Sequence, residues 1–346
     1  MPRDLSSNLP DLITAGSRIL RADTMQPVLL RGVNRSGLEY TEPTEAGFLQ
    51  AAGFTADEVW EIVESWHSNV IRVPFNQDWA LHGRRGHSAG EYLTSLDQVI
   101  AWAAALGAYT IVDLQWLDAE TVYGHVKDEH QGKRENHVAP TPNDETIELW
   151  NTLATRYREE PAVLFDLLNE PHDPLPDDFL PIHVLDTNGV VVESDSGFVG
   201  PEEWTPWAAR LVQEVRQIRP NGLLLVEGVD WGFDLRGVRV EAPNVVYSAH
   251  IYSNRKPRTW SRALENAADA PVFIGEWGGT DGDLDFARTL TAWMRQQDLG
   301  WAAWSWVDYP KLVQPPRAPV YEPTLFGAFV REELRRVDAT KTIRDV

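Results

Sequence analysis

AYTIVDLQW at residues 108–116 and AVLFDLLNE at residues 162–170 are two apolar, β-rich runs that decide the fold. Their nearly continuous hydrophobicity is typical of strands that are buried on both faces. Between them, the segment Glu145–Arg158 repeats apolar side chains at helical spacing. A strand, a helix and a second strand in this order predict a βαβ unit with parallel strands.

Six further runs have the same character. They are residues 28–34 (VLLRGVN), 69–75 (NVIRVPF), 222–228 (GLLLVEG), 244–250 (NVVYSAH), 271–277 (PVFIGEW) and 300–306 (GWAAWSW). Helical patterns at Thr55–Ser65, Ser95–Leu106, Glu203–Ile218 and Asp285–Gln297 lie between them, whereas the connection from Gly228 to Asn244 is too short for a full helix. Eight strands alternating with helices predict an α/β fold, a (β/α)8 TIM barrel.

The sequence has no linker or repeat that would separate domains, so we expect residues 1–346 to form a single catalytic domain, with residues 1–27 as an N-terminal cap. Three long polar or proline-rich segments follow strands, at Leu117–Asn143, Pro171–Gly200 and Asp308–Pro323. Because the active sites of such barrels lie at the ends of the strands that carry these βα loops, we expect these segments to wall a cleft.

Composition excludes several classes of function. The formal net charge of -21 disfavours nucleic acid and acidic membrane surfaces as partners, and no apolar run is long enough to span a bilayer. The absence of cysteine removes disulfides and thiolate chemistry. No secretory signal is visible, which leaves the compartment open. We expect a monomer that acts on a neutral substrate, and the 15 tryptophans suit a glycan because sugar rings stack on indole.

Polar side chains end most of the predicted strands, where a barrel directs them into one concave face. Two of them are carboxylates on facing strands, Glu170 and Glu276. Hydrolysis of a glycoside needs a protonated acid at the leaving oxygen and a second carboxylate. In a retaining enzyme that second carboxylate attacks the anomeric carbon.

The chain resembles glycoside hydrolase family 5, the cellulase-like family of the barrel glycosidase clan with two catalytic glutamates. The motifs that carry the resemblance are Arg72-Val73-Pro74-Phe75, Leu168-Asn169-Glu170-Pro171, His250-Ile251-Tyr252, Ile274-Gly275-Glu276-Trp277 and Trp304-Ser305-Trp306, and Leu30-Arg31-Gly32-Val33-Asn34 suits the first strand. The match runs from about Leu30 to Trp306. It implies a retaining β-glycoside hydrolase that needs no cofactor or metal.

The resemblance also implies roles for single residues. Glu170 would be the general acid/base and Glu276 the nucleophile. Arg72 would keep Glu276 ionised, since a nearby cation favours a carboxylate. The remaining residues would bind substrate: Asn169 at the sugar 2-hydroxyl, His250 and Tyr252 lining the reacting subsite, and Trp304 stacked under the sugar.

One position departs from the family pattern, because Gln115 stands where the family usually has histidine at the end of strand three. Glutamine can exchange hydrogen bonds but cannot titrate, so we expect Gln115 to orient sugar hydroxyls. The most concrete hypothesis is an endo-β-1,4-glucanase that acts on β-glucan or its oligosaccharides. An exo-acting β-glucosidase, a mannanase and a non-catalytic carbohydrate-binding barrel remain alternatives. A metal-dependent hydrolase would need converging ligands, and His125, Asp128, Glu129 and His130 match no usual zinc motif.

Overall fold

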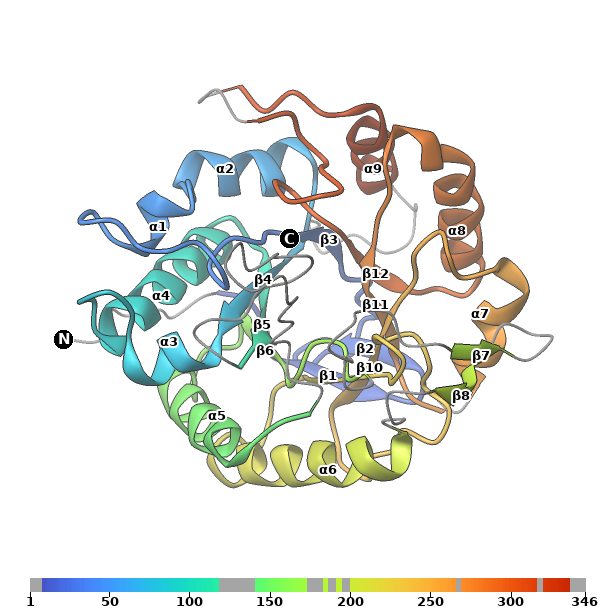
Figure 1. The fold of residues 1–346 in the computed structure, drawn as a ribbon, viewed down its shortest axis with the longest axis horizontal. Helices are drawn as coiled ribbons and strands as arrows, with labels where there is room; N and C mark the ends of the chain where they lie inside the picture. The colour runs from blue at the N-terminus through green and yellow to red at the C-terminus, as the bar shows by residue number, and fades with distance from the viewer. Residues whose placement is uncertain are drawn as a thin grey trace, which may run out of the picture.

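The computed structural model describes residues 8–117, 141–172, 183–185, 191–194, 200–265, 269–315 and 320–336. Its centre is a closed barrel of eight parallel strands, seen end-on in Figure 1. In chain order these are β3 (Arg31–Asn34), β4 (Val70–Asn76), β5 (Tyr109–Trp116), β6 (Val163–Asp166), β9 (Leu224–Glu227), β10 (Val245–His250), β11 (Val272–Trp277) and β12 (Gly300–Ala303). Each predicted run matches one strand, with β4 extending one residue beyond its run, so the predicted TIM barrel is confirmed.

Helices surround the barrel (Figure 1). The larger ones are α4 (Ala89–Ala105), α5 (Asp144–Arg156), α6 (Pro201–Ile218), α8 (Leu284–Gln296) and α9 (Leu325–Arg335). Shorter ones are α1 (Phe48–Ala51), α2 (Ala56–Trp60), α3 (Gln77–His82), α7 (Pro257–Ala263) and the 3-10 turn η3 (Asp281–Asp283). As expected, residues 228–244 form no helix. None of the described helices is long and apolar enough to cross a bilayer.

Capping explains where two of these helices begin. The Thr55 side chain accepts a hydrogen bond from the backbone N–H of Glu58 and caps α2, at the start of the predicted helical pattern Thr55–Ser65. The helix continues as a π-helical turn, η1 (Glu61–Ser65). Helix α4 begins six residues before the predicted Ser95, because Ser88 and Glu91 form a capping box there.

The interior of the barrel has an apolar layer below a polar layer. Five apolar residues in one buried cluster, one on each of five strands, are Val70, Ile111, Leu164, Leu225 and Val246. Side chains two positions apart on a strand point to the same face. The residues two positions further along these strands are Arg72, Asp113, Asp166, Glu227 and Ser248, all of which are buried. The side chains that follow the apolar layer on these strands therefore form a polar, mostly charged layer nearer the C-terminal end of the barrel.

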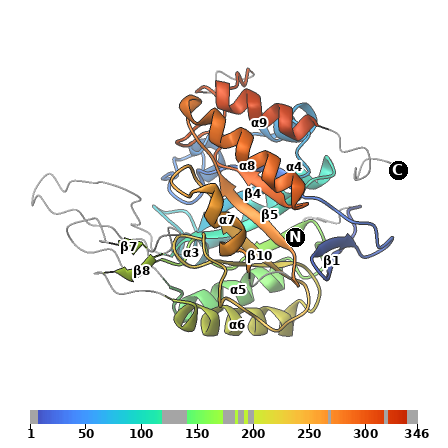
Figure 2. The same ribbon diagram turned by 90° about the vertical axis from the view of Figure 1, so that its right-hand side faces the viewer.

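A hairpin covers the opposite end of the barrel. Strands β1 (Leu12–Ala15) and β2 (Arg18–Arg21) pair antiparallel, and Leu12 and Ile19 belong to the same apolar cluster as Leu30. Figure 2 shows β1 on the side of the barrel opposite a second antiparallel pair, β7 (His183–Leu185) and β8 (Val191–Ser194). That all 346 residues form one domain stays a prediction.

Candidate active site

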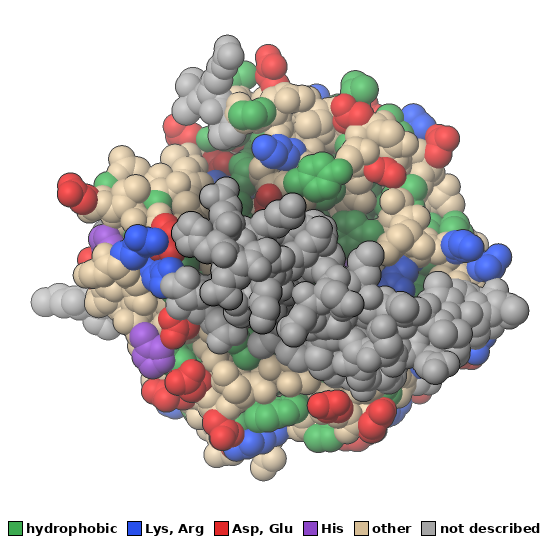
Figure 3. Space-filling model, in the orientation of Figure 1, with side chains coloured by type: hydrophobic (Ala, Val, Ile, Leu, Met, Phe, Trp, Pro, Cys, Tyr) green, Lys and Arg blue, Asp and Glu red, His purple; other side chains and the backbone are tan. Residues whose placement is uncertain are grey.

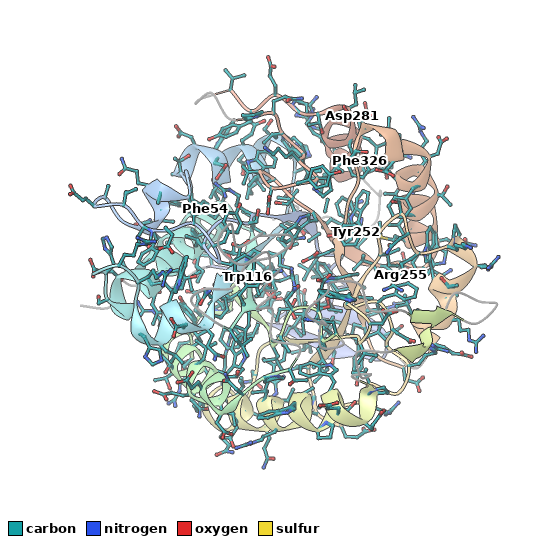
Figure 4. All side chains as sticks on the ribbon, in the orientation of Figure 1. Phe54, Trp116, Tyr252, Arg255, Asp281 and Phe326 are labelled. Carbon is teal, nitrogen blue, oxygen red and sulfur yellow. The ribbon has the colours of Figure 1, made fainter. Side chains whose placement is uncertain are left out.

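The predicted site residues come from separate strands and meet at the C-terminal end of the barrel. Figure 4 shows Trp116, which ends β5, and Tyr252, which follows β10, on opposite sides of the barrel axis and inside the helix ring. Glu170 after β6, His250 on β10 and Glu276 on β11 each place one side-chain atom within 4.8 Å of the others. The structure therefore brings together the two glutamates that the sequence singled out.

Arg72 organises the floor of this site. Its guanidinium is fully buried and forms ion pairs with four carboxylates, those of Asp113, Asp166, Glu227 and Glu276. It donates hydrogen bonds from Nη1 to Glu276 at 2.9 Å and from Nη2 to the Asn169 side-chain oxygen at 2.9 Å. A planar fork of five donors can hold several acceptors in fixed positions, so Arg72 fixes Glu276 relative to Asn169.

Glu276 is held by contacts on both carboxylate oxygens. Oε1 accepts from Arg72, and Oε2 accepts a 2.7 Å hydrogen bond from the Tyr252 hydroxyl. A register shift between β10 and β11 sets Glu276 opposite His250. Burial raises the pKa of Glu276 and nearby Glu170 raises it further, while His250, Arg72 and Tyr252 oppose this. The net shift of the Glu276 pKa is upward, because desolvation outweighs these favourable contacts.

Glu170 lies beyond its strand. Strand β6 ends at Asp166, four residues before Glu170, which has a φ of 48°. A left-handed conformation at a non-glycine residue costs energy and is common at functional sites. Its side chain lies 2.8 Å from Nδ1 of His250, and its backbone carbonyl is 2.7 Å from Nδ1 of His172. Glu170 is only 9% exposed, so its side chain is largely shielded from bulk water.

Two predicted substrate contacts line the same face without direct contacts to the glutamates. Gln115 is on β5 and 9% exposed, and its side-chain oxygen has no hydrogen-bond partner among the described residues. Trp304 follows β12, is half-buried, and donates through Nε1 to the Tyr309 carbonyl at 3.2 Å. An oxygen acceptor and an indole in these positions suit sugar hydroxyls and a sugar face.

The sequence did not settle the roles of several buried groups in the site. Glu227 contacts both Arg72 and His250, Asp166 bonds Arg72 at 2.9 Å, and the Asn34 side chain accepts from Arg72 at 3.0 Å. Asp166 and Asp113 are register partners on neighbouring strands. For Glu227, Asp166 and Asp113, the available signal was a charged residue inside an apolar run, two positions after an interior leucine or isoleucine.

Aromatic residues near the strand ends divide into packing and exposed groups. Trp277 and Trp306 are fully buried, and Trp306 packs edge-on against Trp66 with ring centroids 4.6 Å apart. Tyr309 is exposed, and Trp231 is half-buried and stacks on His172. Trp277 and Trp306 therefore support the barrel, and only the others remain available to a ligand.

The face of the barrel that carries the site has charges of both signs. Figure 3 shows acidic side chains spread around this face with lysine and arginine between them, which suits an uncharged ligand.

Glu170, His250 and Glu276 have the donor types for a metal ion, but Arg72 and Tyr252 already form hydrogen bonds to both carboxylate oxygens of Glu276. That the site needs no metal stays a prediction. His125, Asp128, Glu129 and His130 lie outside the described residues.

Comparison with known proteins gives consistent findings. A family model described as cellulase (glycosyl hydrolase family 5) matches residues 24–310. Endoglucanase A of Evansella cellulosilytica is 24% identical over 341 residues, covering 89% of this chain and 57% of that protein. An endoglucanase of Paenibacillus polymyxa is 24% identical, covering 84% and 78% of the two chains. The chain thus spans less than two thirds of the length of Endoglucanase A, the first of these relatives.

Solved structures share the fold. The native form of β-glucanase SdGluc5_26A from Saccharophagus degradans matches with a TM-score of 0.72 at 19% identity, covering 97% of this chain and 96% of that one. The same β-glucanase has also been solved in complex with cellotetraose.

Proposed function

The chain belongs to the cellulase family, glycosyl hydrolase family 5, and from this premise we propose that it is a retaining endo-β-1,4-glucanase. The observation that carries the proposal is the pair of glutamates, with oxygens within 4.8 Å of one another. Retaining enzymes hold their carboxyl groups about 5–5.5 Å apart, whereas inverting enzymes need about 6.5–9.5 Å to admit a water. The spacing supports double displacement.

In the first step, Glu276 attacks the anomeric carbon and a covalent glycosyl-enzyme forms. The bond from that carbon to the glycosidic oxygen breaks, and its electron pair stays on the oxygen, which takes the proton from Glu170. Arg72 and Tyr252 favour the ionised form of Glu276 before attack. Glu276 then loses its charge, since its oxygen is esterified.

In the second step, Glu170 acts as base. A water replaces the departed sugar, gives its proton to the Glu170 carboxylate, and attacks the anomeric carbon from the same side. Glu276 leaves as a carboxylate, and the product keeps the β configuration. Asn169 accepts from Arg72 through Oδ1, which leaves its NH2 group for the sugar 2-hydroxyl.

The substrate class rests on the relatives. Two curated relatives are named endoglucanases, and a β-glucanase of the same fold has been solved with cellotetraose. A β-1,4-linked glucan or its oligosaccharide is therefore the substrate that we propose. The named relatives also favour endo over exo action.

A substrate panel with matched variants tests the proposal. Soluble β-glucans, mannans, xylans and aryl β-glycosides are incubated with the wild type, Glu170→Gln, Glu276→Gln and Glu160→Gln. Glu160 is a buried glutamate before the start of β6, away from the polar layer, and serves as the control. We expect cleavage inside β-1,4-glucan chains that collapses by at least about 1,000-fold in the first two variants only. Full activity in either of these variants would refute the assignment.

A further inference from the structure

Both ring nitrogens of His250 face carboxylates. Nδ1 lies 2.8 Å from Glu170 and 3.6 Å from Glu276, and Nε2 lies 3.1 Å from Oε1 of Glu227. The three groups form a line from Glu227 through the imidazole to Glu170. A neutral imidazole has one N–H and one acceptor nitrogen, so it would turn a lone pair toward one of these carboxyl groups. Only the imidazolium donates to both sides.

Glu227 lies where no solvent competes for it. It is fully buried, and its Oε1 also accepts a 2.7 Å hydrogen bond from Ser248 and lies 3.5 Å from Arg72. Burial pushes the pKa of Glu227 upward, but His250, Arg72 and Ser248 outweigh it and hold the pKa below its ordinary value. These contacts favour the ionised form of Glu227 beside the imidazole.

Two glycines leave the imidazole no room to turn away. A Cβ at Gly275 would lie 2.4 Å from the Ser248 hydroxyl and 2.9 Å from Nε2 of His250. A Cβ at Gly232, which has a φ of +73°, would lie 2.8 Å from Oε2 of Glu227 and 2.9 Å from Cγ of His250. The backbone thus packs against the Glu227–His250 pair from two sides.

We propose that Glu227 is a positioning residue, which orients His250 and keeps it protonated so that Nδ1–H points at the acid/base Glu170. This role rests on the proposed function of Glu170. It differs from the function of Arg72, which organises the nucleophile. The imidazolium of His250 then donates one hydrogen bond to Glu227 through Nε2 and one to Glu170 through Nδ1.

The electrostatic surroundings support a protonated His250. Burial alone would lower the pKa of His250, but Glu227, Glu276 and Glu170 together raise it well above its usual value. Other charged or titratable groups in this region are Arg72 on β4, Asp113 on β5, Asp166 on β6 and Tyr252 after β10. Burial raises the pKa values of Asp113 and Asp166, and the ion pairs with Arg72 oppose this rise. Glu227 is the carboxylate that contacts Nε2 of His250 directly, at 3.1 Å.

The arrangement of Glu227, His250 and Glu170 affects both catalytic steps. After Glu170 gives its proton to the leaving oxygen, it is a carboxylate beside the Nδ1–H of His250, which stabilises the new charge. In the second step Glu170 takes a proton from water and returns to its starting state. Gln115 stands where the family usually has a histidine, and it cannot exchange a proton with Glu170. In the described part of the site, His250 is the histidine whose side chain contacts the Glu170 side chain.

Histidine NMR on the full-length chain tests the role without relying on activity. The imidazole ¹⁵N signals of His250 are followed against pH in the wild type and in Glu227→Gln, with His250→Asn used for assignment. We expect the variant to lose the His250 proton at a pH at least about one unit lower, since a nearby opposite charge shifts a pKa by about 1–3 units. The basic limb of kcat/KM on a soluble β-glucan should move down in parallel.

Three further variants make the result decisive. Glu227→Asp keeps the charge and should restore most of the shift, Ser248→Ala should give a smaller shift in the same direction, and Glu160→Gln should give none. If Glu227→Gln does not fold, the Ser248→Ala titration decides. An unchanged His250 titration with only lowered stability would overturn the proposal. A wild type that hydrolyses no glycoside would refute the proposed function, while the NMR titration would still decide the role of Glu227.

Discussion

Tyr252→Phe tests how the nucleophile is kept ionised. The Tyr252 hydroxyl donates a 2.7 Å hydrogen bond to Oε2 of Glu276, and phenylalanine removes only that donor. A hydrogen bond to a charged group contributes about 1.5–3 kcal/mol. At about 1.36 kcal/mol per pKa unit, its loss should raise the pKa of Glu276 by about 1–2 units.

The direction follows from the role of Glu276. Attack requires the carboxylate, and burial already holds the pKa of Glu276 above its ordinary value. Activity is therefore lost as the pH falls through this raised pKa. A further rise moves the acid limb of kcat/KM to higher pH by about 1–2 units, while activity on the alkaline side of that limb changes less.

The assay is the pH dependence of kcat/KM on an aryl β-cellobioside or a soluble β-glucan. Tyr247→Phe is the matched control, because Tyr247 lies on β10, the strand that Tyr252 follows, and its hydroxyl accepts a 2.8 Å hydrogen bond from the backbone N–H of Val240. The control should lose stability and keep the wild-type acid limb. An acid limb that stays in place in Tyr252→Phe would refute the reasoning.

Three other perturbations have definite expected outcomes. Glu58→Ala removes the partner of fully buried Arg35, so denaturant unfolding should show a loss of about 3–5 kcal/mol; a loss below about 1 kcal/mol would contradict this. Gln115→Ala should lower kcat/KM on β-glucan with little change in thermal stability, and full activity would remove Gln115 from the substrate contacts. Excess EDTA should leave hydrolysis unchanged, and loss that zinc restores would indicate a metal at Glu170, His250 and Glu276.

The barrel was predictable because its strands are buried on both faces and read as continuous apolar runs. The strand ends were less predictable. Leu167 and Leu168 extend the apolar run of β6, yet the strand ends at Asp166, because the chain turns into the loop that carries Glu170. Helix α9 was not predicted, because Leu325–Arg335 follows a proline-rich segment and lies beyond the last of the eight predicted strands.

The two glutamates could be predicted because their motifs are local in sequence. The role of Glu227 could not, because it depends on the pairing of β9 with β10, which sets Glu227 opposite Ser248 and near His250, and on the two glycines that confine the ring. The upward pKa shift of Glu276 was also hidden, since burial is a property of the assembled site. Packing likewise decided that Trp277 and Trp306 are core residues.

The stereochemistry of hydrolysis tests the central claim most directly. Cellotetraose or a longer soluble β-1,4-glucan is cleaved by the wild type, and the anomeric protons of the product are followed by NMR from the first minutes. We predict that the β-anomer appears first and then equilibrates with the α-anomer, as double displacement by Glu276 requires. The α-anomer appearing first would contradict the account, because it would mean a single displacement by water with Glu276 as base.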